Sequence, residues 1–257
     1  MQVQVVIPMA GLGTRFANSG YSVPKPLLPI HGEPMFKVVM ANLMDKRVAS
    51  FTVIAQAEWD LGGEIAILAQ SIRQTINLIE IDYITDGPAS TVELARPFLR
   101  PEWPVVTGNS DQYVASDMED FYHQLLDGFI DGSILTMEDD DPKWSYAAVS
   151  PEGLVSEVRE KKVISPYATV GIYGFRTADL MYGAFERMKQ QNDSVNNEFY
   201  VAPAYNHLIQ SGLKISSKNL GPISQVMYGL GIPSDYESFI RKPVSKTAAL
   251  RAREMSS

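Results

Sequence analysis

Glycine and two basic residues gather in the first 30 residues of this chain. Residues 10–16 read AGLGTRF and residues 24–30 read PKPLLPI. Glycine lets backbone N–H groups approach phosphate oxygens because it carries no Cβ atom. Arg15 can hold two oxygens at once, whereas Lys25 can act as a point charge. The combination favours a polyphosphate ligand, although a surface loop with two incidental basic residues would show the same pattern.

Two standard phosphate-binding motifs do not fit this loop. A Walker loop that starts at Gly13 needs glycine at position 18, where the chain has Asn18. The dinucleotide-binding motif G-x-G-x-x-G fits Gly11 and Gly13, but Phe16 replaces its third glycine. The prolines of the second segment prevent a continuous helix. A loop of roughly 25 residues is usually functional or disordered, and prolines stiffen this one, which favours a function.

Composition limits the classes of protein that the chain can belong to. Its 257 residues include 30 acidic and 22 basic side chains, with a net charge of −8 and no cysteine. A net acidic chain is not expected to bind nucleic acid, and without cysteine neither disulfides nor thiolate sites can form. No apolar run approaches the about 18 residues of a membrane span, and the N-terminal residues do not resemble a signal peptide. We expect a cytoplasmic protein with small-molecule partners.

Strand and helix patterns alternate along most of the chain. Apolar, β-branched runs predict strands, and apolar residues at helical spacing predict helices. The predicted strands are 3–7, 51–55, 78–84, 104–107, 134–137, 146–149, 154–160 and 168–175. The predicted helices are 34–44, 65–76, 93–99, 121–130, 177–190 and 199–211. This order predicts an α/β fold with a mixed, mostly parallel central sheet flanked by helices. We expect one domain at 1–240, with a β-rich insertion at 144–176, and a C-terminal helix or tail at 241–257.

The glycine loop and the segment that follows it also resemble a known family. GLGTRF followed by PKPLLPI is similar to the signature of the sugar-nucleotide pyrophosphorylases, whose pattern is G-x-G-[ST]-R and then P-K-x-[LM]-x-P. The resemblance extends over most of the chain, to about residue 240. It implies the nucleotide-diphospho-sugar transferase fold, a GT-A-like relative of the Rossmann architecture. The implied reaction joins an NTP to a sugar 1-phosphate and releases pyrophosphate, as in nucleotide-sugar and polysaccharide biosynthesis.

The resemblance assigns the nucleotide to the loop after the first strand. Arg15 and Lys25 would be catalytic residues, with Arg15 on the β and γ phosphates and Lys25 on the reacting phosphates. The residues implied for nucleotide binding are Ala10, Gly11, Gly13, Thr14, Gly87 and Thr91. The last two belong to a segment that would read the base. The same segment can be explained as a helix N-terminus with a capping box formed by Ser90 and Glu93.

The resemblance assigns the metal and the acceptor to later segments. Asp111 would bind Mg²⁺, which typically takes one or two carboxylates together with phosphate oxygens. Glu160 would accept hydrogen bonds from sugar hydroxyls, and Lys161 would bind the sugar phosphate. Gly171 and Glu198 would also lie near the sugar. Each of these residues also has a non-functional explanation. Asp111 could cap a turn, and Glu160 and Lys161 could form a surface ion pair. Glu198 could place a negative charge at a helix N-terminus.

One departure from the family leaves other functions open. Many relatives carry a second metal-binding aspartate two residues before a glycine. If Gly231 is that glycine, Gly229 stands at the aspartate position, and Asp235 follows too late and is expected to cap a helix. A catalytically silent nucleotide-sugar-binding regulatory protein is therefore one alternative.

Two further alternatives concern the acceptor. A cytidylyltransferase that acts on a phosphorylated non-sugar acceptor, such as phosphocholine, would differ only in the acceptor pocket. A glycosyltransferase of related fold would need an Asp-x-Asp pair. Asp139 and Asp141 have that spacing, but they lie in an acidic run that we expect to form a solvated turn. The base, the sugar and the formation of a homo-oligomer are left open.

Overall fold

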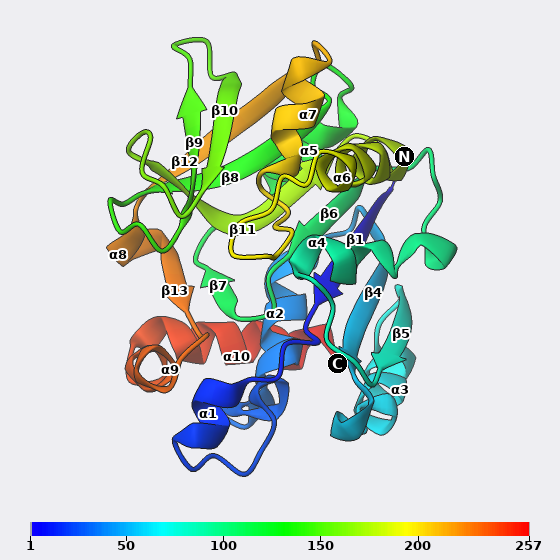
Figure 1. Cartoon of the computed structure of the whole chain (residues 1–257). Helices are drawn as coiled ribbons and strands as arrows, with labels where there is room; N and C mark the ends of the chain where they lie inside the picture. The colour runs from blue at the N-terminus through cyan, green and yellow to red at the C-terminus, as the bar shows by residue number, and fades with distance from the viewer. Residues whose placement is uncertain (1, 257) are drawn as a thin grey trace.

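The computed structural model describes residues 2–256, so Met1 and Ser257 lie outside the described residues. Within that part of the chain nine strands form one sheet, which crosses the molecule in Figure 1. The strands are β1 (Val3–Pro8), β4 (Val48–Gln56), β5 (Thr75–Ile81), β6 (Val105–Gly108), β8 (Gly132–Glu138), β9 (Ser145–Val149), β10 (Val155–Glu160), β11 (Tyr167–Phe175) and β12 (Ile215–Pro222). Neighbours β6, β1, β4 and β5 are all parallel. Of the nine strands, only β10 and β11 run against the others, which confirms the predicted mixed, mostly parallel sheet.

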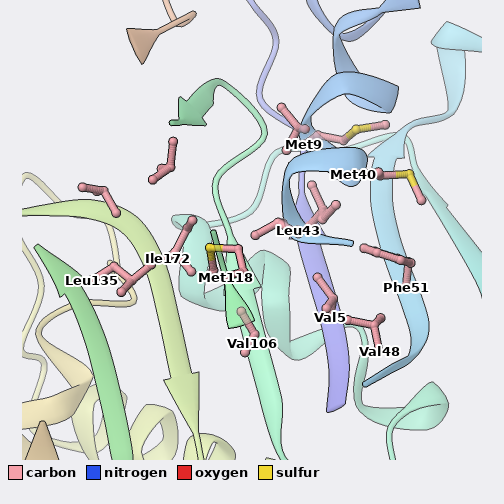
Figure 2. Close-up of a cluster of buried hydrophobic side chains, with 14 of the residues drawn as sticks. Val5, Met9, Met40, Leu43, Val48, Phe51, Val106, Met118, Leu135 and Ile172 are labelled. Atoms are coloured by element: carbon pink, nitrogen blue, oxygen red, sulfur yellow. The ribbon is translucent and has the colours of Figure 1, made fainter. Parts of the chain in front are cut away.

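Helices cover both faces of this sheet. They are α2 (Met35–Leu43), α3 (Gly62–Ser71), α4 (Pro88–Glu93), α5 (Glu119–Leu126), α6 (Ala178–Gln190) and α7 (Ala204–Gln210). Neighbouring residues of a buried strand point to opposite faces, so Val5 and Val6 of β1 join different clusters. Val5 packs with residues of α2, α3 and α5, and Figure 2 shows it with Met40 and Leu43 of α2. Val6 packs with residues of α4, α6 and α7.

A third cluster holds the long loop after β1 against the end of the chain. The loop contains α1 (Thr14–Asn18), the 3-10 turn η1 (Lys25–Leu27) and the hairpin of β2 (Pro29–Ile30) with β3 (Glu33–Pro34). Phe16, which is 1% exposed, lies edge-on to Tyr236, with ring centroids 6.0 Å apart. Tyr236 belongs to α9 (Pro233–Ile240), and α10 (Pro243–Met255) completes the cluster; both helices lie beside α1 in Figure 1. The loop is therefore ordered by helices from the other end of the chain.

Short segments complete the fold. Strands β7 (Gln112–Val114) and β13 (Met227–Gly229) form a separate antiparallel pair. The remaining helical segments are η2 (Ala57–Trp59), η3 (Arg96–Phe98) and α8 (Ile223–Val226). None of the helices within residues 2–256 is both long and apolar enough to cross a membrane.

Several predicted boundaries are wrong. The helix predicted at 65–76 ends at Ser71, because residues from Thr75 onward pair with β4. The helix predicted at 93–99 is only the short 3-10 turn η3, and the α-helix of this region is α4, which begins at Pro88 and ends at Glu93. The pattern also missed β12, whose residues Ser216, Ser217 and Lys218 have weak strand propensity. This segment is a strand because it pairs in parallel with β8, and such pairing cannot be predicted from a local pattern. The β-rich region joins the main sheet through β9, β10 and β11, and the predicted domain boundary at residue 240 stays a prediction.

Candidate active site

A cavity of about 320 Å³ opens beyond the carboxyl end of β6. In open α/β sheets ligands bind at the carboxyl ends of the strands. Five residues named from the sequence line this cavity, namely Arg15, Asp111, Glu160, Lys161 and Gly171. They come from α1, the loop after β6, β10 and β11, which are far apart along the chain. The structure thus brings together residues that the sequence could only name one by one.

The cavity exists because β11 changes its partner at Gly171. Residues Ile172–Phe175 pair with β6, whereas Ala168 pairs with Tyr146 of β9. Gly171 has a φ of +73°, and a Cβ atom there would lie 1.9 Å from Oε1 of Gln112. Its carbonyl accepts a hydrogen bond of 3.0 Å from the backbone N–H of Asn109. Glycine at this position therefore lets Asn109 and Gln112 enter the cavity wall.

Lys25 and Asp111 form an ion pair. The Nζ atom of Lys25 donates to Oδ2 of Asp111 at 3.0 Å, and the two side chains are 13% and 32% exposed. Lys25 lies in η1 and packs its Cβ atom 3.3 Å from the position that a Cβ of Gly13 would take. Gly13 itself has a φ of +60°, which favours glycine. The glycine loop therefore sets the position of Lys25 as well as its own.

Four of the residues predicted to bind the nucleotide, Ala10, Gly11, Gly13 and Thr14, lie along the same loop, outside the cavity lining. Ala10 is buried, while Gly11 and Thr14 are exposed. A Cβ atom on Gly11 would meet nothing within 4 Å. Arg15 lines the cavity, and among residues 2–256 no side chain forms an ion pair or hydrogen bond with its guanidinium. An unpaired cation at a cavity wall is available to an anionic ligand.

The segment with Gly87 and Thr91 is organised differently from the capping box. Gly87 is the N-cap of α4, so Ser90 lies in the first turn, and its buried hydroxyl has no partner among the described residues. Gly87 has a φ of +122°, and a Cβ atom there would lie 2.5 Å from the backbone nitrogen of Phe199. Its close contact in the structure is thus with the backbone of Phe199. The Thr91 hydroxyl donates to the carbonyl of Gly87 at 3.2 Å.

Glu160 is the acidic group at the other end of the cavity. Its carboxylate accepts a hydrogen bond from the hydroxyl of Ser145. Burial raises the pKa of Glu160 above its ordinary value of 4.5, and the negative charge of Glu198 raises it further, while Ser145 and Lys161 oppose the shift. A half-buried carboxylate that keeps one strong donor can accept further hydrogen bonds from hydroxyl groups of a ligand.

Lys161, Tyr200 and Glu198 form a chain of contacts beside Glu160. The ammonium of Lys161 donates to the hydroxyl oxygen of Tyr200 at 2.6 Å, and that hydroxyl donates to Glu198. Lys161 and Tyr200 line the cavity, whereas Glu198 is exposed and lies outside its lining. The turn of residues 195–198 holds Glu198, and α7 begins only at Ala204. The proposal of a charge at a helix N-terminus is therefore wrong, and Glu198 acts on the cavity through Tyr200.

The acidic run at 138–141 begins with the last residue of β8 and continues into the loop before the turn at residues 142–143, and it orients two residues of the cavity. One oxygen of Asp139 accepts backbone N–H groups of the turn, and the other accepts the indole N–H of Trp144 at 2.6 Å. Asp141 pairs with Lys143 at 2.9 Å. Both Lys143 and Trp144 line the cavity. Asp139 and Asp141 thus each hold one residue of the cavity wall through a side-chain contact.

The donor set around Asp111 limits how a metal could bind. Within residues 2–256 no three acidic or histidine side chains gather closely enough to hold a metal ion by themselves. Mg²⁺ usually keeps waters and takes one or two carboxylates plus substrate phosphates. A single half-buried aspartate fits that pattern, provided that substrate phosphates supply the remaining ligands.

The neighbourhood of Gly229 is not free of acidic groups. The carboxylate of Asp235 lies 3.2 Å from the position that a Cβ atom of residue 229 would take. Asp235 belongs to the first turn of α9, whose N-cap is Ile232, so the expected helix cap is wrong. Gly231 packs against Asp111: a Cβ atom at position 231 would lie 2.9 Å from Oδ2 of Asp111. Asp235 lines a separate cavity of about 270 Å³, which shares Lys143 and Trp144 with the first.

Sequence reasoning missed several residues of the cavity wall. They are Asn109, Gln112, Trp144, Ser145, Thr169, Tyr173 and Tyr200. Asn109 and Gln112 lie close to Asp111 in the chain. Their position directly after a predicted strand could have identified them as residues of the site. Ser145 and Tyr200 carry no such signal, because pairing of β9 with β10 and the turn at 195–198 bring them to the cavity.

The sequence matches a known protein family. The sequence model described as "Nucleotidyl transferase" matches residues 4–208, a range that contains every residue of the site named above except those after α7. The chain belongs to the nucleotidyl transferase family. Membership confirms the resemblance that GLGTRF and PKPLLPI indicated. Helices α9 and α10, which hold the glycine loop of this nucleotidyl transferase, lie outside the matched range.

Solved structures and a curated relative agree with this family. The nucleoside-diphosphate-sugar pyrophosphorylase from Vibrio cholerae RC9 is 26% identical, with a TM-score of 0.78, over 93% of this chain and 100% of that chain. The inositol-1-phosphate CTP transferase from T. maritima is 15% identical with a TM-score of 0.75, over 100% and 98% of the two chains, and shows the fold alone. The bifunctional protein GlmU of Methanococcus aeolicus is 25% identical over 221 residues, 83% of this chain. The chain spans about half (50%) of that relative's length.

Proposed function

We propose that this protein transfers a nucleotidyl group from an NTP to a sugar 1-phosphate and releases pyrophosphate. The observation that carries the proposal is the single cavity in which Arg15, Asp111, Glu160 and Lys161 meet at the carboxyl end of the sheet. Two cations and a carboxylate suit phosphates and a metal, and a second carboxylate suits hydroxyl groups. The similarity to a sugar-nucleotide pyrophosphorylase supports the same reaction. We further propose a cytoplasmic location, in line with the cysteine-free sequence.

The reaction needs charge and alignment more than covalent help. An oxygen of the acceptor phosphate attacks the α-phosphorus, the bond from that phosphorus to the β-bridging oxygen breaks, and pyrophosphate leaves with the electron pair. Because the acceptor phosphate is already anionic, no side-chain base is required. Arg15 would stabilise the β and γ phosphates, and Lys161 would hold the acceptor phosphate. Lys25 would stabilise the charge that develops on the oxygens of the transferred phosphate.

Asp111 would hold Mg²⁺ together with phosphate oxygens. When bound, the ion would neutralise charge on those oxygens. Lys25 already balances the charge of Asp111. The ion pair would be exchanged for contacts with the metal and the phosphates when substrates bind.

The glycine at position 11 supports a ligand in the loop. Neither a left-handed φ nor a close neighbour within 4 Å requires glycine there. Gly13, Gly87 and Gly171, in contrast, each have a positive φ. A requirement for glycine at position 11 would therefore come from a bound nucleotide rather than from the fold.

The cavity favours a hydroxylated acceptor over a trimethylammonium one. A quaternary ammonium group needs open aromatic faces. The ammonium of Lys161 lies 4.6 Å from the ring centroid of Tyr200, and that of Lys143 lies 4.7 Å from the ring of Trp144. Both rings are thus covered by cations of the protein, which would also repel a cationic acceptor. Glu160 offers hydrogen-bond acceptance to hydroxyl groups instead.

The experiment is a measurement of pyrophosphate release with the purified protein and Mg²⁺. ATP, CTP, GTP, UTP and dTTP are each combined with sugar 1-phosphates and with phosphorylated amino-alcohols such as phosphocholine. Release with a sugar 1-phosphate supports the proposal and names both substrates. Release with phosphocholine alone would replace the sugar by a non-sugar acceptor. Silence with every pair, while a nucleotide still raises the melting temperature, would favour the regulatory alternative suggested by Gly229.

A further inference from the structure

The side chain of Gln56 joins two segments that leave neighbouring strands. Gln56 is the last residue of β4 and is 4% exposed. Its Nε2 amide donates to the carbonyl of Ala10 at 2.5 Å and to the carbonyl of Tyr83 at 3.1 Å. Ala10 follows β1 and Tyr83 follows β5, the two strands on either side of β4. Both N–H donors of one amide are therefore used to hold the two segments at a fixed separation.

The segment on the β5 side is held together by hydrogen bonds within residues 85–91. The hydroxyl oxygens of Thr85 and Thr91 lie 2.6 Å apart, and both lie 3.2 Å from the carbonyl oxygen of Gly87, so that one hydroxyl donates to the other and the second donates to Gly87. Backbone hydrogen bonds join Asp86 and Ala89 to Phe199. Tyr83 lies two residues before this group in the chain, so its hydrogen bond to Gln56 limits where the segment can lie relative to the glycine loop.

We infer that Gln56 is a positioning residue of the nucleotide site: its amide sets the distance between the glycine loop and the base-reading segment. The inference rests on the proposed function, and on the nucleotide contacts that the family resemblance implies for the glycine loop and for the segment with Gly87 and Thr91. Gln56 lines none of the cavities described above, so it acts through the two backbone segments that it holds. A nucleotide that spans both segments needs them at one separation, and losing the amide lets the separation vary.

Asn206 offers a matched control elsewhere in the fold. Its side chain also makes two hydrogen bonds to a backbone, accepting from the N–H of Val158 and donating to the carbonyl of Val158, both at 2.8 Å. Val158 belongs to β10, an edge strand that pairs with β9 and with none of β1, β4 and β5. Asn206→Leu therefore removes the same kind and number of contacts without loosening the nucleotide end.

The test compares nucleotide binding to Gln56→Met and Asn206→Leu, at a temperature at which both are folded. The probe is whichever of ATP, CTP, GTP, UTP and dTTP raises the melting temperature of the wild type most. We expect Gln56→Met to raise the Kd for that nucleotide by about tenfold. The Kd should be unchanged in Asn206→Leu and in Gln70→Met, a second control at an exposed glutamine. Hydrogen exchange should become faster in both segments, 9–16 and 82–91, in Gln56→Met alone.

Other results would overturn the inference. Equal loss of nucleotide affinity in Gln56→Met and Asn206→Leu would mean a general loss of stability, and unchanged affinity in Gln56→Met would remove the role. Should Gln56→Met fail to fold, Gln56→Asn keeps the amide on a shorter side chain and should give a smaller but selective loss. A wild type that binds nucleotide and releases no pyrophosphate overturns the proposed function alone, because the binding comparison still decides the role of Gln56. A wild type that binds no nucleotide overturns both.

Discussion

The Nζ atom of Lys25 lies 3.0 Å from Oδ2 of Asp111, although 86 residues separate them in the chain. The contact joins the loop after β1 to the loop after β6. In the proposed reaction the two groups serve the same phosphates, one directly and one by holding Mg²⁺. Free of substrate, each keeps the other's charge balanced in a half-buried position.

Because they act as a unit, Lys25→Met and Asp111→Asn should not have independent effects. Each should lower pyrophosphate release by about 100-fold, the typical effect of removing one charge-stabilising group. The double variant should lose much less than the product of the two, since groups in contact are not additive. The measurement is kcat/KM for the wild type, the two single variants and the double variant. Strictly multiplicative losses would mean that the ion pair plays no part in the reaction.

Arg15→Ala should lower turnover by about 10³-fold if the guanidinium stabilises charge in the transition state. Its melting temperature should stay near that of the wild type, because Arg15 is exposed and no described side chain pairs with it. Arg73→Ala, at another exposed arginine, serves as the control and should keep full activity. A near-native kcat/KM in Arg15→Ala would remove Arg15 from the mechanism.

Alanine at two glycines should separate strain in the fold from contact with a ligand. Gly171→Ala puts a Cβ atom 1.9 Å from Oε1 of Gln112 at a φ of +73°. Strain of about 2 kcal/mol should lower the melting temperature by roughly 4–8 °C. Gly11→Ala meets no atom within 4 Å, so its melting temperature should be unchanged.

The activity of Gly11→Ala should nevertheless fall by about 100-fold, because a Cβ atom would displace the bound phosphates. The check is pyrophosphate release beside a thermal unfolding curve for each variant. Full activity in Gly11→Ala would show that no phosphate approaches this position. An unchanged melting temperature in Gly171→Ala would contradict the tight packing around β11.

The raised pKa of Glu160 should appear in stability as a function of pH. In the folded protein the carboxyl holds its proton to a higher pH than the unfolded chain, whose value is near 4.5. Between those two pKa values the folded state binds more protons, so stability falls as pH rises. Glu160→Gln does not lose stability in this way, because its amide does not titrate. Its melting temperature relative to wild type should therefore increase from pH 4 upward and level off above the folded pKa. A difference that stays constant with pH would contradict burial as the cause of the shift.

Local patterns in the sequence were enough for the fold class and for the segments of the site. Runs such as FTVIA at 51–55 predict buried strands whatever their neighbours, and alternation with helices favours a mostly parallel sheet. Glycine, arginine and lysine in GLGTRF and PKPLLPI indicate phosphate chemistry from residue type alone. The same patterns failed at β12 and at the helix boundaries, where pairing with a distant strand outweighs local propensity.

What only the tertiary structure decided is which of these groups meet. The sequence by itself determined the candidates at positions 15 and 25 from the residue types of the glycine loop, and those at 111, 160 and 161 from the resemblance to the family. The partner switch of β11 at Gly171, the ion pair of Lys25 with Asp111 and the contact of Tyr200 with Lys161 all join residues far apart in the chain. Such contacts depend on the order and register of strands, which are set by the packing of the whole sheet and leave no mark on a short segment.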